Sequence, residues 1–418
     1  MSTPNAETDL MDWLAWQEGL HHQEIDLGLE RVGQVARELN LPNEHSTITV
    51  AGTNGKGSCI HYLQSIFLAR GLSVGTFTSP HLTRYNERVR VNGTPVADDA
   101  LVDAFHRINT ARQQIPLTYF EFSTLAALDI FAKRDLDVQL LEVGLGGRLD
   151  ATNIVDANIA IITSIDLDHQ AWLGNTREAI GFEKAGILKP DSRGICGDPN
   201  PPDSIAQAAA GCGCEMDFLT RDFGFEDGVH DWCYWDSDGD VGHLPKLKNH
   251  SDVQMANAAC AIRATRVSGL PIRDNHYLAL SETVVPGRAE IVSGDVNTLL
   301  DVAHNPASVR VLRERLDQMD SQRVLGVVGM LADKDVEDTL APMVGAVDYW
   351  YVGQIHHHRA MDAFVLARLL KRIGAKEVRD FDSVEQAVSV AKTDSVKGDT
   401  LLIFGSFHTV GAALSVGI

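Results

Sequence analysis

Apolar residues follow two alternating patterns along this chain. Short β-branched runs, such as residues 48–51 and 73–78, alternate with stretches in which apolar residues recur at helical spacing. The stretch after residue 58 has Ile60, Leu63 and Phe67 on one helical face. Runs of the first kind predict strands and stretches of the second kind predict helices. The order of strand, glycine-rich turn, helix and strand predicts a βαβ unit with parallel strands.

The rest of the first 287 residues continues this alternation. Helical spacing predicts helices within 9–40 and from 117 through 131, near 181–189 and over 255–268. Nearly continuous apolar runs at 137–143 and 159–165 predict buried parallel strands. Residues 224–244 predict short strands and turns. The fold class that we expect is therefore α/β, with an N-terminal domain that has a parallel central sheet plus a small β-sheet.

A second α/β pattern follows residue 296 and predicts a smaller, Rossmann-like C-terminal domain. It has no Gly-x-Gly-x-x-Gly dinucleotide motif after its first strand. Its strands are expected at 297–302, 323–329, 348–352 and 400–404, and its helices near 307–318, 336–344, 360–373 and 384–394. The expected domains are 1–287, with the nucleotide and substrate sites, and 297–418, joined by a linker at 288–296.

Composition narrows the class of protein. The chain has 418 residues, 44% of them apolar and 22% charged, which is typical of a globular protein of two domains. A net charge of −21 disfavours nucleic acid and anionic membranes as partners. Six cysteines without a Cys-x-x-Cys pair predict reduced thiols.

Residues 1–9 are polar and acidic, so no signal peptide is expected. No apolar run approaches the roughly 20 residues of a membrane span. We expect a cytoplasmic monomer.

The turn after the first strand carries the clearest chemistry. Glycines free backbone N–H groups to face an anion, a helix start adds unpaired donors, and one lysine adds a full charge. An ordinary glycine turn is the alternative, because Gly57 separates the lysine from the hydroxyl of the common P-loop motif. The residues that we expect to bind nucleotide phosphates are Thr53, Asn54, Gly55, Lys56, Gly57 and Ser58. The N-terminal domain of the expected α/β fold is therefore of the P-loop ATPase type.

Polar residues also follow several other predicted strands, where ligands of doubly wound α/β proteins bind. Ser79 is a candidate magnesium or phosphate ligand, or a serine that caps a turn. Glu142 is a candidate Mg²⁺ ligand, because a buried carboxylate is costly unless it is paired or bound to metal. His169 is either a metal ligand or a hydrogen-bonded core histidine.

Other polar clusters favour plainer interpretations. Residues 236–240 resemble the opening of a calcium loop, but the misplaced glycine favours a hairpin turn. Residues 356–358 are consecutive histidines that cannot converge on one ion, so an exposed loop is expected. By pattern alone, His21 and His22 are expected at the surface, and so is Lys184.

Taken together, these stretches resemble the folylpolyglutamate synthase/dihydrofolate synthase family, a branch of the Mur ligase superfamily. The residues that carry the resemblance are Gly52-Thr-Asn-Gly-Lys-Gly-Ser, Thr78-Ser-Pro-His, Leu117-Thr-Tyr-Phe-Glu-Phe, Glu142-Val-Gly-Leu-Gly-Gly-Arg-Leu-Asp-Ala-Thr-Asn, Asp168-His, Phe182-Glu-Lys-Ala-Gly-Ile, Pro286-Gly-Arg, Asp301-Val-Ala-His-Asn-Pro and Gly405-Ser-Phe-His-Thr. The resemblance implies a ligase that uses ATP as co-substrate and Mg²⁺ at two sites. It would join L-glutamate to dihydropteroate and to reduced folates through an acyl phosphate.

The resemblance also implies roles for single residues. Lys56, Lys184 and His304 would serve catalysis, with Lys184 carbamylated and His304 near the glutamate, where a structural hydrogen bond is the alternative. The ATP contacts beyond the phosphate loop would be Asn257, Arg288 and Asp301. The metal ligands would be Ser79, Glu142, His169 and Lys184. The pterin pocket would be lined by Gly19, Leu20, His21, His22, Thr118, Tyr119, Phe120, Glu121, Leu149, Asp150 and Ala151.

Three other functions compete with this interpretation. Another Mur-type amino-acid ligase, acting on a nucleotide-sugar peptide, would share the same motifs. A P-loop NTPase switch or motor would hydrolyse nucleotide without a carboxylate acceptor, and then the series of carboxylate, histidine and lysine would have no purpose. A nucleotide-binding module without catalysis would have the same difficulty.

Overall fold

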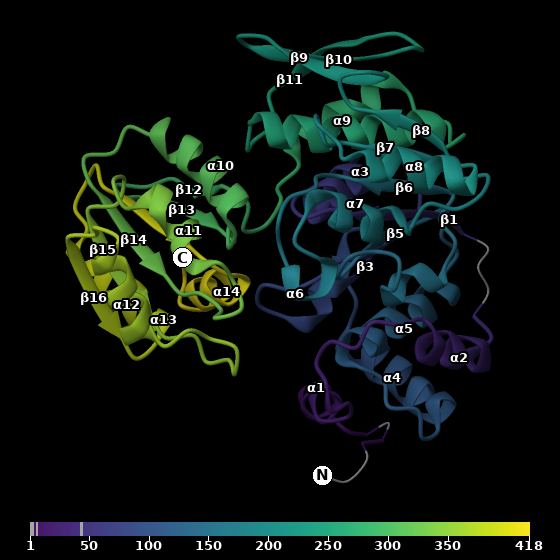
Figure 1. Ribbon diagram of the computed structural model, residues 1–418, viewed down its shortest axis with the longest axis horizontal. Helices are drawn as coiled ribbons and strands as arrows, with labels where there is room; N and C mark the ends of the chain where they lie inside the picture. Colours follow the sequence, from purple (N-terminus) through teal and green to yellow (C-terminus); the bar gives the residue numbers. More distant parts are fainter. Residues whose placement is uncertain (1–3, 6, 42–44) are drawn as a thin grey trace. The chain divides into compact units, whose positions relative to one another are not determined.

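The computed structural model describes residues 4–5, 7–41 and 45–418. Residues 1–3 and 6, which belong to the stretch where no signal peptide is expected, lie outside this description. The chain forms two compact units (Figure 1). Unit 1 comprises Met1–Pro80 and Asn86–Thr283, and unit 2 comprises His81–Tyr85 and Val284–Ile418.

An eight-stranded sheet forms the centre of unit 1, in the order β4-β3-β2-β5-β1-β6-β7-β8. Six strands are parallel, while β3 pairs with β2 and with the edge strand β4 in antiparallel fashion. Their bounds are β1 Ser46–Ala51, β2 Val74–Phe77, β3 Val89–Val91, β4 Thr94–Pro95, β5 Val138–Glu142, β6 Ile159–Ile162, β7 Arg193–Cys196 and β8 Glu215–Phe218. The inner strands β1, β5 and β6 are almost fully buried, as a sheet covered on both faces requires.

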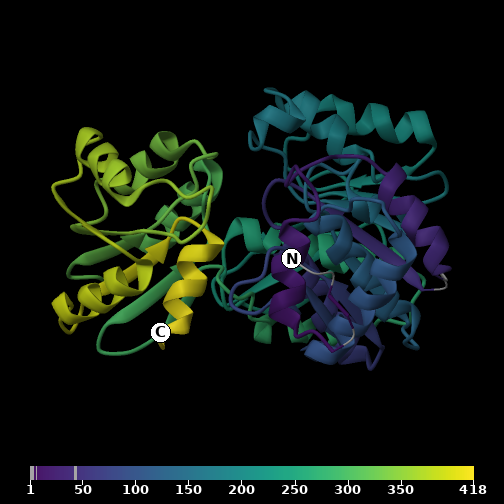
Figure 2. The same ribbon diagram turned by 90° about the horizontal axis from the view of Figure 1, so that it is seen from below.

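Helices cover this sheet, and a small antiparallel sheet with the order β11-β10-β9 packs beside α9 (Figure 1). The N-terminal helices α1 and α2 pack against α4 and α5, the purple and blue helices of Figure 2. The bounds are α1 Leu10–Glu18, α2 Glu30–Leu39, α3 Lys56–Arg70, α4 Asp98–Arg112, α5 Tyr119–Ala132, α6 Gln170–Leu173, α7 Arg177–Ala185, α8 Asp203–Cys212, α9 Asp252–Val267, β9 Phe223–Asp227, β10 Asp231–Asp236 and β11 Val241–Pro245.

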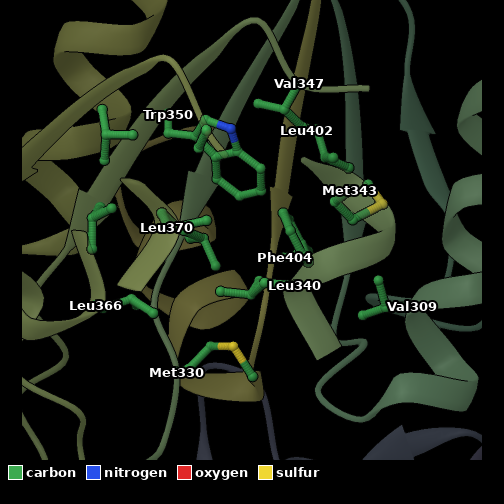
Figure 3. Packing of buried hydrophobic residues seen from close by; sticks show 14 of the residues in the cluster. Val309, Met330, Leu340, Met343, Val347, Trp350, Leu366, Leu370, Leu402 and Phe404 are labelled. Atoms are coloured by element: carbon green, nitrogen blue, oxygen red, sulfur yellow. The ribbon is translucent and has the colours of Figure 1, made fainter. Parts of the chain in front are cut away.

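Unit 2 contains a six-stranded sheet in the order β12-β13-β17-β14-β15-β16, in which only β12 is antiparallel among the described strands. One face packs into a core around Trp350, Leu340 and Phe404 (Figure 3). The chain ends in α14, the yellow helix beside the label C in Figure 2. The bounds are β12 Glu290–Val292, β13 Asn297–Asp301, α10 Pro306–Asp317, β14 Val324–Val328, α11 Val336–Leu340, β15 Tyr349–Gly353, α12 Ala363–Arg372, β16 Glu377–Phe381, α13 Val384–Asp394, β17 Thr400–Phe404 and α14 Phe407–Ser415.

Several local features differ from the sequence-based expectations or were not foreseen, among the latter β7, α8 and β8. The expected linker, 288–296, contains β12, which pairs with β13. The strand expected at 159–165 ends at Ile162, so residues 163–169 form an irregular segment. Strand β16 was not foreseen, because most of its residues are exposed and it has no apolar run. Helix α4 was not foreseen either, although Leu101, Phe105 and Ile108 have helical spacing and are buried.

Other expectations are confirmed. Residues 236–240 connect β10 and β11 as a hairpin. All six cysteines are free, and Cys59, Cys196, Cys214 and Cys260 are buried. None of the helices that the structure describes is both long enough and apolar enough to cross a membrane.

Candidate active site

The glycine-rich turn lies at the carboxyl edge of the unit 1 sheet, between the ends of β5 and β6. Strand β1 leads into it, with Val50 paired to Glu142 of β5 and Ala51 paired to Ile162 of β6. Helix α3 begins at Lys56, so the N–H groups of its first turn have no carbonyl partner within the helix. Strand, turn and helix start are therefore arranged as an anion site requires.

Lys56 places its charge over this turn. Its Nζ lies 3.0 Å from the carbonyl oxygen of Gly52 and 3.5 Å from that of Thr53. The ammonium group therefore lies on the same side of the loop as these carbonyls, and it is half-buried rather than extended into solvent. A cation held here can neutralise negative charge on a phosphate group.

Asn257 of α9 lies against the turn, although it is 200 residues away in the sequence. Gly55 has a φ of +87°, and a Cβ built on it would lie 2.5 Å from Asn257 Oδ1 and 2.8 Å from Nδ2. The Asn257 side chain is buried, and its Nδ2 has no hydrogen-bond partner among the described residues. A buried amide donor without a partner is costly, and a bound polar ligand would remove that cost.

Ser79 and Glu142 also meet at this edge of the sheet. Glu142 is the last residue of β5, and its Oε2 accepts a hydrogen bond of 3.1 Å from the backbone N–H of Ser79, which follows β2. The same carboxylate lies near the first turn of α3, because a Cβ on Gly57 would be 3.6 Å from Oε2. A buried carboxylate close to a serine residue offers oxygen donors of the kind that suits a hard cation such as Mg²⁺.

Lys184 of α7 is buried, with 3% of its surface exposed, so the expectation of a surface lysine is wrong. Burial and, to a lesser extent, the positive charge of Lys56 lower the pKa of its amine to about 7, while Asp168 and Asp150 oppose this shift. The loop after β5 packs tightly on the backbone at the end of α7. A Cβ on Gly147 would lie 2.9 Å from the Lys184 carbonyl oxygen.

His169 does not follow its strand directly. It precedes α6 with a φ of +50°, seven residues after β6 ends. The backbone N–H of His169 donates to Asp168 Oδ1 over 2.8 Å, and its ring Nε2 lies 4.0 Å from the same oxygen. The neighbouring Asp168 was not among the predicted site residues, and its carboxylate acts electrostatically on Lys184.

The three stretches predicted to line a pterin pocket are connected by a series of polar contacts. His21 Nε2 lies 3.3 Å from Asp26 Oδ2, and Arg31 Nη1 lies 2.7 Å from the same oxygen. Arg31 Nη2 then lies 3.3 Å from Glu121 Oε1. The N–H of Gly28 donates to the carbonyl of Leu149 over 3.2 Å. Residues 26–31, which were not among the predicted pocket residues, thus connect the predicted stretches.

Several of these residues have structural partners of their own. His21 is buried and stacks on exposed His22, so the expectation of two surface histidines is wrong for His21. Thr118 and Glu121 form the capping box of α5. Asp150 accepts hydrogen bonds from Gly144, Leu145 and Thr152, and burial raises the pKa of its carboxyl.

The other predicted pterin residues lie around these partners. Phe120 contacts Phe77 and fills the space that a side chain on Gly144 would need, and Tyr119 lies under the Arg88 guanidinium. The remaining ones are Gly19 and Leu20, which follow α1 and are not buried, and Ala151, which is buried at the start of a short 3₁₀ helix.

In unit 2, the polar residues at strand ends form a second cluster. Asp301 accepts hydrogen bonds of 2.7 Å from the N–H groups of Ala289 and Ala303, and burial raises the pKa of its carboxyl although Arg288 opposes this. The Arg288 guanidinium lies 5.1 Å from the Phe407 ring centroid, and the centroid of the His304 ring lies 6.3 Å from that same Phe407 centroid. His304 Nδ1 is also within 2.9 Å of the Val302 carbonyl oxygen, which is the structural hydrogen bond considered above.

The consecutive histidines 356–358 lie in a loop after β15. His356 and His358 are exposed as expected, while His357 is half-buried and its ring lies 4.7 Å from that of His408. In the part of the chain that the structure describes, no group of three or more His, Cys, Asp or Glu side chains has the arrangement of a metal site. Any metal at Glu142 would therefore need other donors.

These features define a class of protein, a nucleotide-using ligase of the Mur type, and comparison with known proteins supports this class. The family model of the Mur ligase glutamate ligase domain matches residues 287–407. The dihydrofolate synthase/folylpolyglutamate synthase of Escherichia coli K12 is 44% identical over 99% of this chain and 97% of its own length. The enzyme of the same name from Haemophilus influenzae is 38% identical over 97% of each chain. The chain belongs to the dihydrofolate synthase/folylpolyglutamate synthase family.

Solved structures agree with this assignment and with the predicted fold class, a two-domain Mur ligase fold. E. coli FolC in complex with DHPP and ADP superposes with a TM-score of 0.94, at 43% identity over 99% of both chains. A bifunctional folylpolyglutamate synthase/dihydrofolate synthase with Mn, AMPPNP and L-glutamate bound has a TM-score of 0.91, at 42% identity over 99% of both chains.

Proposed function

We propose that this protein is an ATP-dependent ligase that joins L-glutamate to 7,8-dihydropteroate and to reduced folates. One observation carries the proposal: a phosphate-binding loop, a buried carboxylate and a buried lysine meet at one edge of the unit 1 sheet. Relatives that cover nearly the whole chain bear this activity in their names. A switch protein would need the loop but not Glu142, Lys184 and the segments joined through Arg31.

The chemistry begins with a carboxylate that resists attack by an amine. Transfer of the γ-phosphoryl group of ATP to that carboxylate gives an acyl phosphate and ADP. The amine of glutamate then attacks the acyl carbon, the C–N amide bond forms, and the bond from carbon to the phosphate oxygen breaks. Lys56 and the N–H groups of the first turn of α3 would stabilise the charge on the transferred group.

A divalent cation fits the Ser79 and Glu142 pair, and it would supply charge neutralisation at the phosphates. One solved relative holds Mn together with a nucleotide analogue. We propose Mg²⁺ as the physiological ion and a second site near His169. For unit 2 we propose that Arg288 and Asp301 contribute to nucleotide binding and that His304 helps to position glutamate.

We further propose that Lys184 is carbamylated. The reaction requires a neutral amine, which attacks CO₂ to form an N–C bond and releases one proton. A pKa of about 7 makes the neutral amine abundant at physiological pH, whereas an ordinary lysine with a pKa of 10.5 is almost fully protonated. Incubation with ¹³C-labelled bicarbonate should give a carbamate carbon signal that the Lys184→Arg variant lacks.

For substrate recognition, we propose that the pterin pocket includes the predicted stretches around Glu121 and Leu149 together with residues 26–31, which contact both. We also propose that residues 1–287 and 297–418 act as the two domains, and that the protein works as a monomer in the cytoplasm. The six free cysteines are consistent with a reducing compartment.

The decisive experiment measures phosphate release from ATP in the presence of Mg²⁺ and L-glutamate. Dihydropteroate, a reduced folate and a UDP-linked peptide are offered separately. Release that depends on either pterin acid and on glutamate is expected. Release with the UDP-peptide alone would indicate another Mur-type ligase, and release without any acceptor would indicate an NTPase switch.

A further inference from the structure

The segment that follows β6 holds the phosphate-binding loop through a set of side-chain hydroxyls. Thr163, which is almost fully buried, lies with its Oγ1 2.6 Å from the Asn54 carbonyl oxygen and 3.3 Å from that of Ala51. Ser164 Oγ lies 3.0 Å from the same Asn54 oxygen and accepts the Asn54 N–H over 3.1 Å. Two hydroxyls therefore converge on one peptide group of the loop.

Thr53 extends this contact further along the segment. Its N–H donates to the Ser164 carbonyl over 2.7 Å. Its hydroxyl donates to the Asp166 carbonyl over 3.1 Å and accepts the Asp166 N–H over 3.0 Å. The Thr53 hydroxyl is thus occupied at both its donor and its acceptor site by one residue of this segment.

The fit between the two segments leaves no spare room. A Cβ on Gly52, where φ is +154°, would lie 1.9 Å from Thr163 Oγ1. The glycine at this position therefore admits the Thr163 hydroxyl, and that hydroxyl in turn fixes the carbonyl direction of Asn54. The peptide unit is planar. Fixing the direction of the Asn54 carbonyl therefore also fixes the direction of the N–H group in the same peptide.

We propose that Thr163 and Ser164 are positioning residues that hold the phosphate-binding loop in the conformation that binds nucleotide. They do so without touching the nucleotide, because their hydroxyls are directed at the loop backbone. The same segment continues to Asp168 and His169, so loop geometry and the position of these two residues are coupled. This inference rests on the proposed function, since it assumes that the loop binds ATP.

The test compares the affinity for ADP in the presence of Mg²⁺, measured by calorimetry, with the melting temperature of the ligand-free protein. Thr163→Ala removes the hydroxyl and Thr163→Ser keeps it. We expect Thr163→Ala to weaken ADP binding about tenfold, while Thr163→Ser stays within about twofold of the parent, as loss of one buried hydrogen bond predicts. The KM for ATP should rise in Thr163→Ala more than kcat falls.

Thr339→Ala is the matched control, because Thr339 is also fully buried and its hydroxyl donates to a backbone carbonyl, that of Asp335, in unit 2. It should lower the melting temperature and leave ADP affinity unchanged. Should Thr163→Ala fail to fold, Ser164→Ala provides the measurement, with weaker ADP binding again expected.

The proposal would be overturned if the Thr163→Ala variant bound ADP with the affinity of the parent. It would also be overturned if Thr163→Ser weakened ADP binding as much as Thr163→Ala does. A parent protein that binds no ADP would instead remove the proposed function.

Discussion

Replacing Gly55 by alanine tests how the phosphate-binding loop is built. Gly55 has a φ of +87°, a conformation that costs an L-residue about 1–2 kcal/mol. The added Cβ would also lie 2.5 Å from Asn257 Oδ1, so the amide must move by about 0.9 Å to reach the 3.4 Å at which ordinary contact begins. Overpacking of this kind costs about 1–3 kcal/mol. The total expected loss in the free energy of unfolding is about 2–5 kcal/mol.

Gly71→Ala separates the two contributions. Gly71 ends the same helix with a φ of +85°, yet nothing lies within 4 Å of the position that its Cβ would take. Replacing Gly71 by alanine should lower the free energy of unfolding only by the cost of the positive φ, about 1–2 kcal/mol. Urea denaturation followed by tryptophan fluorescence reports on unit 1, because five of the six tryptophans lie there.

The double variant Gly55→Ala with Asn257→Ala completes the cycle, since removing the amide removes the collision. In that background Gly55→Ala should cost no more than Gly71→Ala does. ADP affinity should fall at least about tenfold in Gly55→Ala and stay unchanged in Gly71→Ala. If Gly55→Ala and Gly71→Ala prove equally destabilising, the packing of Asn257 on the loop is not as described, and the reasoning fails.

Further predictions concern charged residues of unit 1. Lys56→Ala should abolish acyl-phosphate formation without changing the circular dichroism spectrum, and full turnover would exclude the loop from the mechanism. Glu142→Ala should lose most of kcat and its dependence on Mg²⁺ concentration, whereas normal kinetics would show that the carboxylate is structural. Arg263→Met should cost about 3–5 kcal/mol in urea denaturation, because Arg263 is buried and pairs with Asp217 and Asp236; a cost below about 1 kcal/mol would contradict this. In CO₂-free buffer, the unfolded protein holds a proton on Lys184 up to pH 10.5 and the folded protein only up to about 7. Unfolding free energy should therefore rise with pH over this range relative to Lys184→Met, and an equal pH dependence in both proteins would refute the shift.

Much of the site could be predicted because its parts are local in sequence. The turn after β1 can be recognised in the sequence by its glycines, its lysine and the helix that follows. Glu142 stands out as a carboxylate at the end of an apolar run, and the structure places it at the end of β5. For both, the local pattern and the rule that ligands bind at the carboxyl edge suffice.

Other residues gain their properties from neighbours that are distant in sequence. The spacing around Lys184 is that of a surface lysine, but the packing of α7 within unit 1 leaves only 3% of its surface exposed. The charges of Asp26 and Arg31 are visible in the sequence, but only the fold brings Glu121 beside Arg31. Similarly, the apolar pattern predicts Thr163 to be part of a strand. A pattern of apolar residues gives no sign of its contact with Asn54.

The sequence by itself determined the alternation of strands and helices, the phosphate-binding turn and the family, since each of these depends on residue types at short, fixed spacing. The tertiary structure decided which side chains are buried away from solvent and which charged groups form ion pairs. Burial and pairing depend on how the sheet orders its strands, with β1 between β5 and β6, and chain order does not specify that arrangement. The lowered pKa of the Lys184 amine and the hydroxyl contacts on the loop are consequences of that packing.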